Sequence, residues 1–179
     1  PLIFDVTDSM AIVESAEKVQ TDLKPGESIA GLVNNAGIAL GGPVTLIDTD
    51  VFRKQFDVNF FGLIDVTKAY LPLLGATKEA QNQGKIINIS SVSGKRSYPF
   101  IAPYTASKFA VEAFSDSLRR ELMMYGVDVI LIEPGPIKTA IWDKTPDPEN
   151  NEFLGSDYEK ALGRFYKLFI EMGKKGFDA

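Results

Sequence analysis

Tyr104 and Lys108 are the two side chains of this sequence that best suit acid–base chemistry. They lie four residues apart in a segment that is expected to be helical, so their polar ends can approach the same ligand. A phenol transfers protons poorly at neutral pH, but a neighbouring ammonium group favours the phenolate and lowers the pKa of the phenol. The pair therefore predicts a proton donor and acceptor. An exposed helical pair without a catalytic role is the alternative, and it is the usual reason for this spacing.

The chain contains no His and no Cys, which limits the chemistry that it can perform. Ser-His-Asp triads, thiolate nucleophiles, disulfides and zinc sites built from Cys or His are excluded. A proton transfer near neutral pH must then use an Asp, Glu, Lys or Tyr with a shifted pKa. This exclusion fits an acid–base centre at Tyr104 and Lys108, and we predict no metal site.

Ser91 follows the apolar segment 87–89, where the chain turns into a polar loop. Its hydroxyl could hydrogen-bond a carbonyl oxygen on which negative charge develops during a reaction. Serines at such turns, here also Ser90 and Ser93, commonly bond only to the local backbone. The sequence leaves both interpretations open.

Asn59 lies between Val58 and Phe60 in a segment expected to form a helix over residues 50–74. A buried amide with such neighbours needs hydrogen-bond partners. It either bonds to the backbone and kinks the helix, which we favour from the residues alone, or it serves a site.

Two turns after predicted strands could approach a flat ligand. Asn34-Asn35-Ala36-Gly37 has small residues that allow a ligand near the backbone, although the turn could simply end the strand. In residues 134–139, Thr139 and the free backbone groups around Ile137 could hold an amide, and a rigid loop is the alternative. Asp5 is interpreted by default as an acid at a helix entry.

Helical and strand-like segments alternate along the chain and predict an α/β fold. The predicted strands cover residues 29–33, 85–89 and 127–132, after a short apolar run at residues 2–4. The predicted helices cover residues 9–23, 50–74 (disturbed by Pro72), 104–125, and a last segment that starts at a capping box at residues 156–159. This order predicts a doubly wound parallel sheet with its ligand crevice at the carboxyl ends of the strands.

Two of these helices have apolar stripes that are expected to define their buried faces. The stripe of the long helix consists of Ala106, Phe109, Ala110, Ala113, Phe114, Leu118 and Leu122. The stripe of the last helix consists of Leu162, Phe165, Phe169 and Met172.

Composition and charge indicate one soluble globular domain. The chain has 179 residues, of which 45% are hydrophobic and 24% charged. No apolar segment is long enough to span a bilayer, and the formal net charge of −5 with scattered bases argues against a nucleic-acid or anionic-membrane partner. We expect a cytoplasmic location, with a membrane anchor in a preceding segment left open.

The spacing of five motifs resembles the short-chain dehydrogenase/reductase family: Asn34-Asn35-Ala36-Gly37, Asn59, Ser91, Tyr104-x-x-x-Lys108 and Pro134-Gly135. The resemblance covers residues 5–139 nearly without gaps. It implies a Rossmann-like doubly wound sheet that binds NAD or NADP and interconverts an alcohol and a carbonyl by hydride transfer. Residues 118–134 are similar to the branch that acts on steroids, retinoids and related carbonyls.

The resemblance implies a role for each of four catalytic residues. Tyr104 would be the general acid/base, and Lys108 would lower the pKa of Tyr104 and hold the nicotinamide ribose. Ser91 would orient the substrate carbonyl or alcohol, and Asn59 would support a water-linked proton relay to Lys108.

Other positions would contact the cofactor. Asp5 and Val6 would meet the adenine, and Asn35, Ala36 and Gly37 would line the ribose region. At the nicotinamide end, Ile137 and Thr139 would fix the carboxamide beside Pro134. The resemblance also implies that residues 140–175, including Trp142, form a substrate-binding lid. Its apolar stripe indicates an apolar substrate, although burial against the core would explain the same stripe.

One part of the family pattern has no counterpart in this sequence. Members open with a strand, a glycine-rich turn that seats the pyrophosphate at a helix N-terminus, and a second strand whose end selects NAD or NADP. We expect the chain to begin at the end of the third strand, to lack about 60 residues before it, and to stop before the final strand. Residues 1–179 would then be one partial catalytic domain, inactive and with weak or no cofactor binding when alone.

A noncatalytic dinucleotide-sensing or scaffold protein on the same fold is the alternative, because a fold does not determine a function. The presence of Ser91, Tyr104 and Lys108 favours the enzyme. The resemblance also implies a homodimer or homotetramer, in which Phe60 and Phe61 could pack against a partner.

Overall fold

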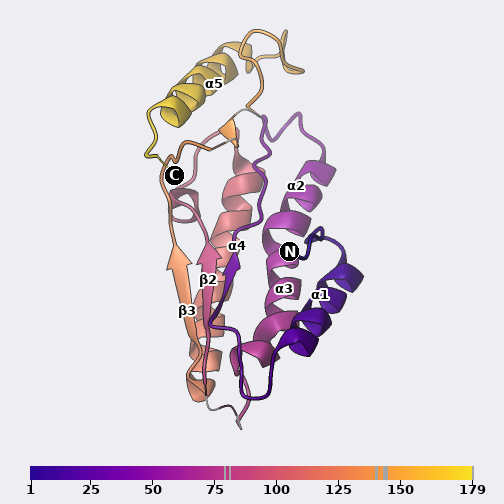
Figure 1. Ribbon diagram of the computed structural model, residues 1–179. Helices are drawn as coiled ribbons and strands as arrows, with labels where there is room; N and C mark the ends of the chain where they lie inside the picture. Colours follow the sequence, from indigo (N-terminus) through magenta and orange to yellow (C-terminus); the bar gives the residue numbers. More distant parts are fainter. Residues whose placement is uncertain (79, 81, 140, 143–144, 179) are drawn as a thin grey trace.

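Parallel strands form the centre of the fold. The computed structural model describes residues 1–78, 80, 82–139, 141–142 and 145–178. In this part of the chain, β1 (Gly31–Asn34), β2 (Lys85–Ile89) and β3 (Asp128–Ile132) form one sheet in the order β1-β2-β3. All neighbours are parallel, so the carboxyl ends of the strands meet at one edge (Figure 1). The predicted α/β fold with a parallel sheet is confirmed.

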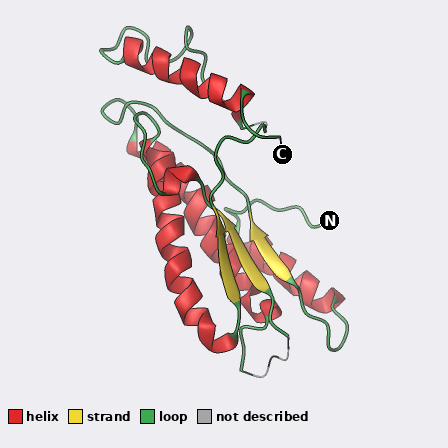
Figure 2. Cartoon of the chain, turned by 90° about the vertical axis from the view of Figure 1, so that its left-hand side faces the viewer, coloured by secondary structure: helices red, strands yellow, loops and turns green. Residues whose placement is uncertain are grey.

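Five α-helices accompany the described strands: α1 (Ser9–Asp22), α2 (Thr49–Phe56), α3 (Gly62–Tyr70), α4 (Ala102–Leu122) and α5 (Glu159–Lys174). Figure 2 shows α4 beside the strands and α5 beyond their carboxyl ends. None of the helices in the described ranges is both long and apolar enough to cross a membrane.

Local signals explain several of these boundaries. The carboxylate of Asp8 accepts hydrogen bonds from the amides of Met10 and Ala11, so it caps α1. Gly126 takes the left-handed conformation, with φ of 73°, and ends the 3₁₀ turn Met123–Tyr125 that follows α4. The strand predicted at residues 29–33 begins later, at Gly31.

The segment predicted as one helix over residues 50–74 contains three kinds of helix. After α2 the chain forms a π-turn at Asp57–Phe61, then α3, then a 3₁₀ turn at Leu71–Leu74 that contains Pro72. The cap is Asp48 rather than Thr49, because its carboxylate accepts from the amide of Asp50. Pro72 disturbs the end of the helix as predicted.

Helices α3 and α4 cover one face of the sheet. The hydrophobic core on this face consists of six buried side chains from the strands, α4 and the neighbouring segments: Leu74, Ile86, Leu118, Leu122, Val127 and Val129. Side chains that point to the opposite face of the sheet are exposed, as Val33 (56%) and Ile132 (45%) show.

The predicted buried face of α4 is wrong for most of its length. Phe109 is exposed, and the buried positions include Ser107, Val111 and Ser115 beside the expected Leu118 and Leu122. The reason is that the sheet presents polar groups to α4: the side-chain amide of Asn88 donates to the hydroxyl of Ser115 (2.8 Å). A helix face chosen by hydrophobicity alone is therefore turned towards solvent.

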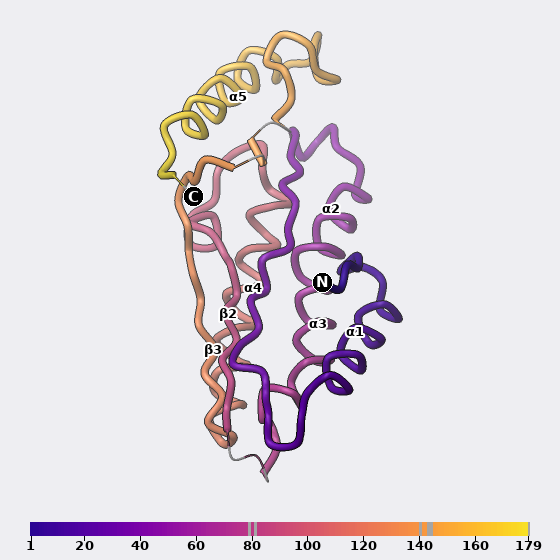
Figure 3. Tube along the Cα trace, in the orientation of Figure 1, coloured from indigo at the N-terminus to yellow at the C-terminus, as the bar shows by residue number. Residues whose placement is uncertain are grey.

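The apolar run at residues 2–4, expected to be the end of a strand, forms no strand, because no described strand hydrogen-bonds to it. Ile3 is 93% exposed, while Phe4 packs near α3. The trace in Figure 3 shows this N-terminal segment passing α3 before α1 begins. The capping box predicted at residues 156–159 does not form, since the carboxylate of Glu159 accepts from the amide of Gly155, and α5 begins at Glu159.

Candidate active site

Ser91, Tyr104 and Lys108 come together at the carboxyl ends of the strands. Ser91 lies two residues after the end of β2 and caps the 3₁₀ turn Val92–Gly94, where its hydroxyl accepts from the amide of Ser93 (3.1 Å). Tyr104 and Lys108 lie in the first turns of α4. The local backbone interpretation of Ser91 therefore holds. Its side chain also interacts with the phenol of Tyr104, and its role towards a substrate stays a prediction. The Nζ of Lys108 lies 5.8 Å from the centre of the Tyr104 ring.

Lys108 is a buried cation rather than part of an exposed helical pair. Its side chain is buried, and its Nζ donates to the carbonyl oxygen of Ile89 at the end of β2 (2.8 Å). Burial lowers the pKa of Lys108 from 10.5 to about 8, and the carboxylate of Glu112 partly opposes that shift. At neutral pH most molecules therefore carry the positive charge inside the site.

Tyr104 has a raised pKa, contrary to the expectation that Lys108 would lower it. Burial of the phenol raises the pKa, and the hydrogen bond with Ser91 opposes this only in part. The ammonium group lies over the ring and donates to Ile89 rather than to the phenol oxygen. Tyr104 is consequently a protonated phenol at neutral pH, which suits it to donate a proton.

Asn59 lies in the π-turn and joins two other parts of the site. Its Oδ1 accepts from the amide of Ile38 (2.8 Å), and its Nδ2 donates to the carbonyl of Ile38 (3.0 Å) and to the hydroxyl of Ser107 (3.2 Å). The hydroxyl of Ser107 donates to the carbonyl of Tyr104 (2.7 Å). Asn59 bonds to backbone and lies where the helix is interrupted, as favoured, but this backbone belongs to Ile38 after β1 and not to its own helix. A role of Asn59 in the site stays a prediction. Such π-turns are frequent at functional sites.

Gln55 supports the same segment and was not identified from the sequence. Its fully buried side chain accepts from the amide of Leu40 (2.7 Å) and donates to the carbonyl of Ile38 (2.8 Å). The sequence did contain a sign of its role: Gln55 lies one helical turn before Asn59, so the two side-chain amides share one face of the helix.

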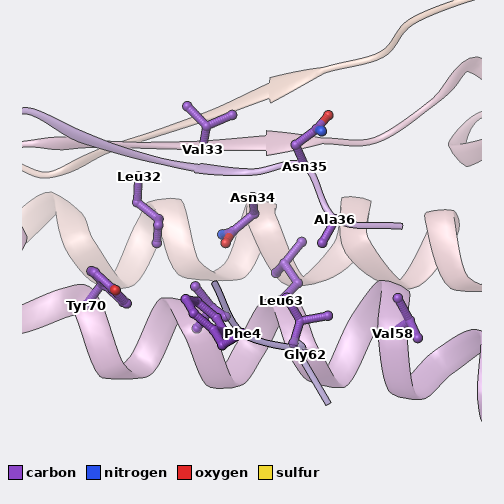
Figure 4. Close-up of a pocket in the computed structure, with 12 residues that line it drawn as sticks. Phe4, Leu32, Val33, Asn34, Asn35, Ala36, Val58, Gly62, Leu63 and Tyr70 are labelled. Atoms are coloured by element: carbon purple, nitrogen blue, oxygen red, sulfur yellow. The ribbon is translucent and has the colours of Figure 1, made fainter. Parts of the chain in front are cut away.

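Asn34 belongs to a buried polar network and not to the exposed turn. Its Nδ2 donates to the hydroxyl of Thr67 on α3 (2.9 Å) and to the Oδ1 of Asn88 (2.8 Å). Figure 4 shows Asn34 directed towards the helices, whereas Asn35 points the other way. The predicted turn therefore divides into an internal Asn34 and the exposed residues 35–37.

A cavity of about 230 Å³ opens beside this turn. Val6, Asn35 and Ala36 line it, together with residues of β1 and α3 (Figure 4). Asp5 lies outside this lining, and its carboxylate accepts from the amide (2.9 Å) and hydroxyl (2.8 Å) of Thr7, as a helix-entry acid does. These bonds lower the pKa of Asp5. The exposed small residues and the apolar cavity fit a flat adenosine group at Val6, Asn35 and Ala36, and less well at Asp5.

The loop after β3 offers fewer free backbone groups than predicted. The carbonyl of Ile137 accepts from the indole of Trp142 (2.6 Å), and the amide of Lys138 donates to the carbonyl of Phe177 (2.8 Å). The carbonyl of Pro136 accepts from the amide of Phe177 (3.0 Å). Thr139 is exposed, so its hydroxyl is accessible for a hydrogen bond with an amide group of a ligand.

Helix α5 lies above the carboxyl ends of the strands (Figure 1). Much of its apolar stripe is used in packing: Leu162 is buried with Phe153 and Tyr166, and Phe165 stacks on Phe169 at 5.3 Å. The core interpretation of the stripe therefore holds for Leu162. Residues 140, 143 and 144 of the predicted lid lie outside the described residues. Within the described ranges, no cluster of acidic residues could hold a metal ion.

The profile of the short chain dehydrogenase family matches residues 1–150. The chain belongs to this family. It is 46% identical over 176 residues to the NADPH-dependent 3-dehydrocapnine reductase of Ornithobacterium rhinotracheale, covering 98% of this chain and 61% of that protein. It is 41% identical over 175 residues to retinol dehydrogenase 16 of Homo sapiens, covering 88% of this chain and 53% of that protein.

Solved structures of the family share the fold. A short chain dehydrogenase/reductase from Burkholderia phymatum in complex with NAD superposes with a TM-score of 0.75 and 26% identity, over 96% of this chain and 61% of that chain. ElxO with NADP bound gives a TM-score of 0.69 and 28% identity, over 83% of this chain and 58% of that chain. The chain thus spans less than two thirds of each relative that it matches here, and the Rossmann-like α/β fold is shared.

Proposed function

We propose that this chain carries the catalytic residues of an NAD(P)-dependent oxidoreductase that interconverts an alcohol and a carbonyl. The observation that supports it most is the convergence of Ser91, Tyr104 and Lys108 at the carboxyl ends of the strands. Ligands of open α/β sheets bind at this edge. The family membership points in the same direction.

In the proposed mechanism each side chain of this site has a role, and the pKa directions of Tyr104 and Lys108 support two of them. Tyr104, protonated at neutral pH, gives its proton to the carbonyl oxygen of the substrate during reduction. Ser91 donates a hydrogen bond to the same oxygen, where negative charge develops. The buried charge of Lys108 stabilises the phenolate that Tyr104 becomes. The nicotinamide cofactor, when bound, supplies or accepts the hydride.

Residues from three segments would hold NAD or NADP. Val6, Asn35 and Ala36 line the cavity for the adenosine half, with Gly37 exposed beside them. Thr139 would hold the carboxamide. The Nζ of Lys108 has three N–H donors and uses one on Ile89, so two can reach the ribose hydroxyls. Asn59 would hold the segment at Ile38 against α4 and so support a proton relay to Lys108.

An apolar carbonyl compound is the substrate class that we propose. Residues 140–175 would act as the lid, on which Trp142, Phe169 and Met172 leave part of an apolar face accessible. The relatives named for 3-dehydrocapnine and retinol are consistent with a substrate that has a hydrophobic portion. A steroid, a retinoid or another lipophilic ketone fits this description.

The α4 face that is turned to solvent would be a subunit interface. Phe109 on α4 and Phe61 in the π-turn are both exposed large apolar side chains, at 45% and 52%. Phe60 packs against Phe114 with ring centres 6.1 Å apart and joins these surfaces. A second copy of the chain would cover this face in a homodimer or homotetramer.

Replacement of the proposed acid tests the function. In the natural protein, Tyr104→Phe should reduce carbonyl reduction, followed by nicotinamide absorbance, by about 100-fold or more. Tyr125→Phe is a matched control, because this Tyr lies at the far end of α4 in the turn after the helix. Unchanged turnover in Tyr104→Phe would refute the mechanism. Cofactor binding by the wild type without turnover on any carbonyl of a broad panel would favour a dinucleotide sensor.

A further inference from the structure

Glu112 is a buried carboxylate directly behind the site, and the proposed mechanism does not use it. It lies one helical turn beyond Lys108 on α4, so Tyr104, Lys108 and Glu112 follow one another along one face of the helix. Only 6% of Glu112 is exposed. Burying a carboxylate is unfavourable unless nearby charges compensate for it, so its partners should reveal its role.

The surface partner of Glu112 is Lys95, which follows the turn that Ser91 caps. The Nζ of Lys95 lies 2.7 Å from Oε2 of Glu112 and 3.6 Å from Oε1 of Glu133. Glu133 stands just before Pro134 in the loop after β3. This ion cluster therefore connects α4 with the Ser91 turn and with the Pro134 loop. The amide of Val92 also donates to the carbonyl of Pro134 (3.1 Å), so the last two segments are joined directly as well.

Gly94 allows Glu112 to approach the turn this closely. A Cβ at Gly94 would lie 2.8 Å from Oγ of Ser90, 2.9 Å from Cγ of Glu112 and 3.0 Å from Oε1 of Glu112. Such contacts are too short for any side chain at this position. The fit explains why a glycine stands where the turn packs on α4.

Glu112 Oε1 faces the interior without a hydrogen bond to any described residue, and so does Oγ of Ser90. Its charge is therefore not neutralised by local donors on that side. Tyr104 lies beside Lys108, and Glu112 acts on its charge from the next turn of the same helix. Lys95 from the Ser91 turn and Glu133 from the Pro134 loop are the charged groups next to Glu112. Among them, Glu112 is the group that opposes the effect of burial on the pKa of Lys108.

We propose that Glu112 is a positioning residue, which keeps Lys108 charged from behind the site and, through Lys95, holds the Ser91 turn against α4. This inference rests on the proposed function, since it gives Lys108 and Ser91 their purpose. A buried ammonium and a buried carboxylate one turn apart stabilise each other more strongly than they would in water.

The test is a titration of Lys108 in the natural protein without cofactor. The side chains are labelled with ¹³C-lysine, and NMR signals are followed with pH after assignment with Lys108→Met. Glu112→Gln keeps the shape and removes the charge, so the Lys108 pKa should fall by about one unit, a tenfold change in its proton affinity. Glu121→Gln, an exposed acid on the same helix, should leave the Lys108 pKa unchanged.

A Lys108 pKa that is the same in Glu112→Gln and in the wild type would overturn the proposal. Gly94→Ala gives a second reading if Glu112→Gln does not fold, because the added Cβ displaces the carboxylate. A shifted Lys108 pKa in Gly94→Ala supports the proposal, and an unshifted one contradicts it. Glu112→Asp, which keeps the charge, should restore most of the wild-type value.

The alkaline limb of kcat/KM against pH gives a kinetic counterpart. It should move to lower pH in Glu112→Gln by the same amount as the Lys108 pKa, whereas Lys95→Met should lower kcat with little movement of the limb. The NMR titration needs no turnover. An inactive wild type would therefore count against the proposed function, while the effect of Glu112 on Lys108 would still be measured.

Discussion

The Nζ of Lys108 lies 5.8 Å from the centre of the Tyr104 ring and donates to the carbonyl of Ile89 at the end of β2. The two side chains are one helical turn apart, but the strand end decides where the ammonium group is held. Because the site is buried, the phenol of Tyr104 keeps its proton and Lys108 binds its own more weakly. These states suit the roles proposed for the pair, in which Tyr104 gives a proton to an oxygen and Lys108 stabilises the phenolate left behind.

The buried charge of Lys108 predicts a characteristic pH dependence of stability. The pKa of Lys108 is about 8 in the folded chain and 10.5 ordinarily, so between these values the unfolded chain binds the proton and the folded chain does not. Lys108 therefore destabilises the folded chain most below pH 8. Between pH 8 and pH 10.5 its contribution to the free energy of unfolding increases by roughly 3 kcal/mol. Urea denaturation of wild type and Lys108→Met across this range should show the rise only in the wild type.

Lys85→Met serves as the control for that series, because Lys85 is an exposed partner of Asp128 on the surface. Its pH dependence should follow the wild type. Parallel curves for the wild type and Lys108→Met would show that Lys108 is not buried as a charge.

The network under the sheet predicts a large effect at Asn88. This fully buried amide accepts from Asn34 and donates to Ser115, so it links β1, β2 and α4. Asn88→Ala leaves both partners with a lost bond and opens a small void, and the free energy of unfolding should fall by about 2–4 kcal/mol. Asn150→Ala on the surface should change it by less than about 0.5 kcal/mol. Equal urea midpoints for the two variants would contradict the network's role.

Two helical glycines should respond in opposite ways to alanine. A Cβ at Gly62 would lie 2.7 Å from the carbonyl oxygen of Val6, so Gly62→Ala should displace the N-terminal segment and lower the unfolding free energy by about 1–3 kcal/mol. A Cβ at Gly163 would only touch the carbonyl oxygen of Pro148 at 3.8 Å, and Gly163→Ala should stabilise α5 by up to about 1 kcal/mol. Thermal unfolding measures both, and a stabilised Gly62→Ala would show that the close approach to Val6 is absent.

The exposed aromatic face predicts a subunit interface that a charge will break. Phe61→Glu and Phe109→Glu each place a carboxylate in a surface that a second copy would bury, so light scattering of the natural protein should show dissociation to monomers. Met10→Glu alters an even more exposed apolar residue, on α1 (76%), and should leave the assembly intact. A wild type that is monomeric at all concentrations would exclude this interface.

Local patterns were enough to predict much of the architecture. The strand at Lys85–Ile89, the Asp8 cap and the stop at Gly126 follow from short-range signals that act the same way in any fold. The trio of Ser91, Tyr104 and Lys108 also follows from residue types and spacing. Spacing places side chains on a common helix face, and parallel strands bring their carboxyl ends to a common edge.

Other features depend on what each segment packs against. The buried face of α4 was misassigned because Ser115 faces Asn88, and only the packing of α4 against β2 brings these two polar groups together. Asn59 was expected to bond to backbone or to serve a site, but only the folded chain shows that its partners Ile38 and Ser107 come from distant segments. No periodicity in the sequence contains that information.

The sequence by itself determined which groups are available for the chemistry: without His or Cys, a proton transfer needs an Asp, Glu, Lys or Tyr, and Tyr104 with Lys108 is the pair that we propose. The tertiary structure alone decided their state. Burial raises the pKa of Tyr104, lowers that of Lys108 and places Glu112 where it opposes the second shift. A pKa depends on solvent access and on charges brought near by folding, and neither is encoded in the spacing of residues along the chain.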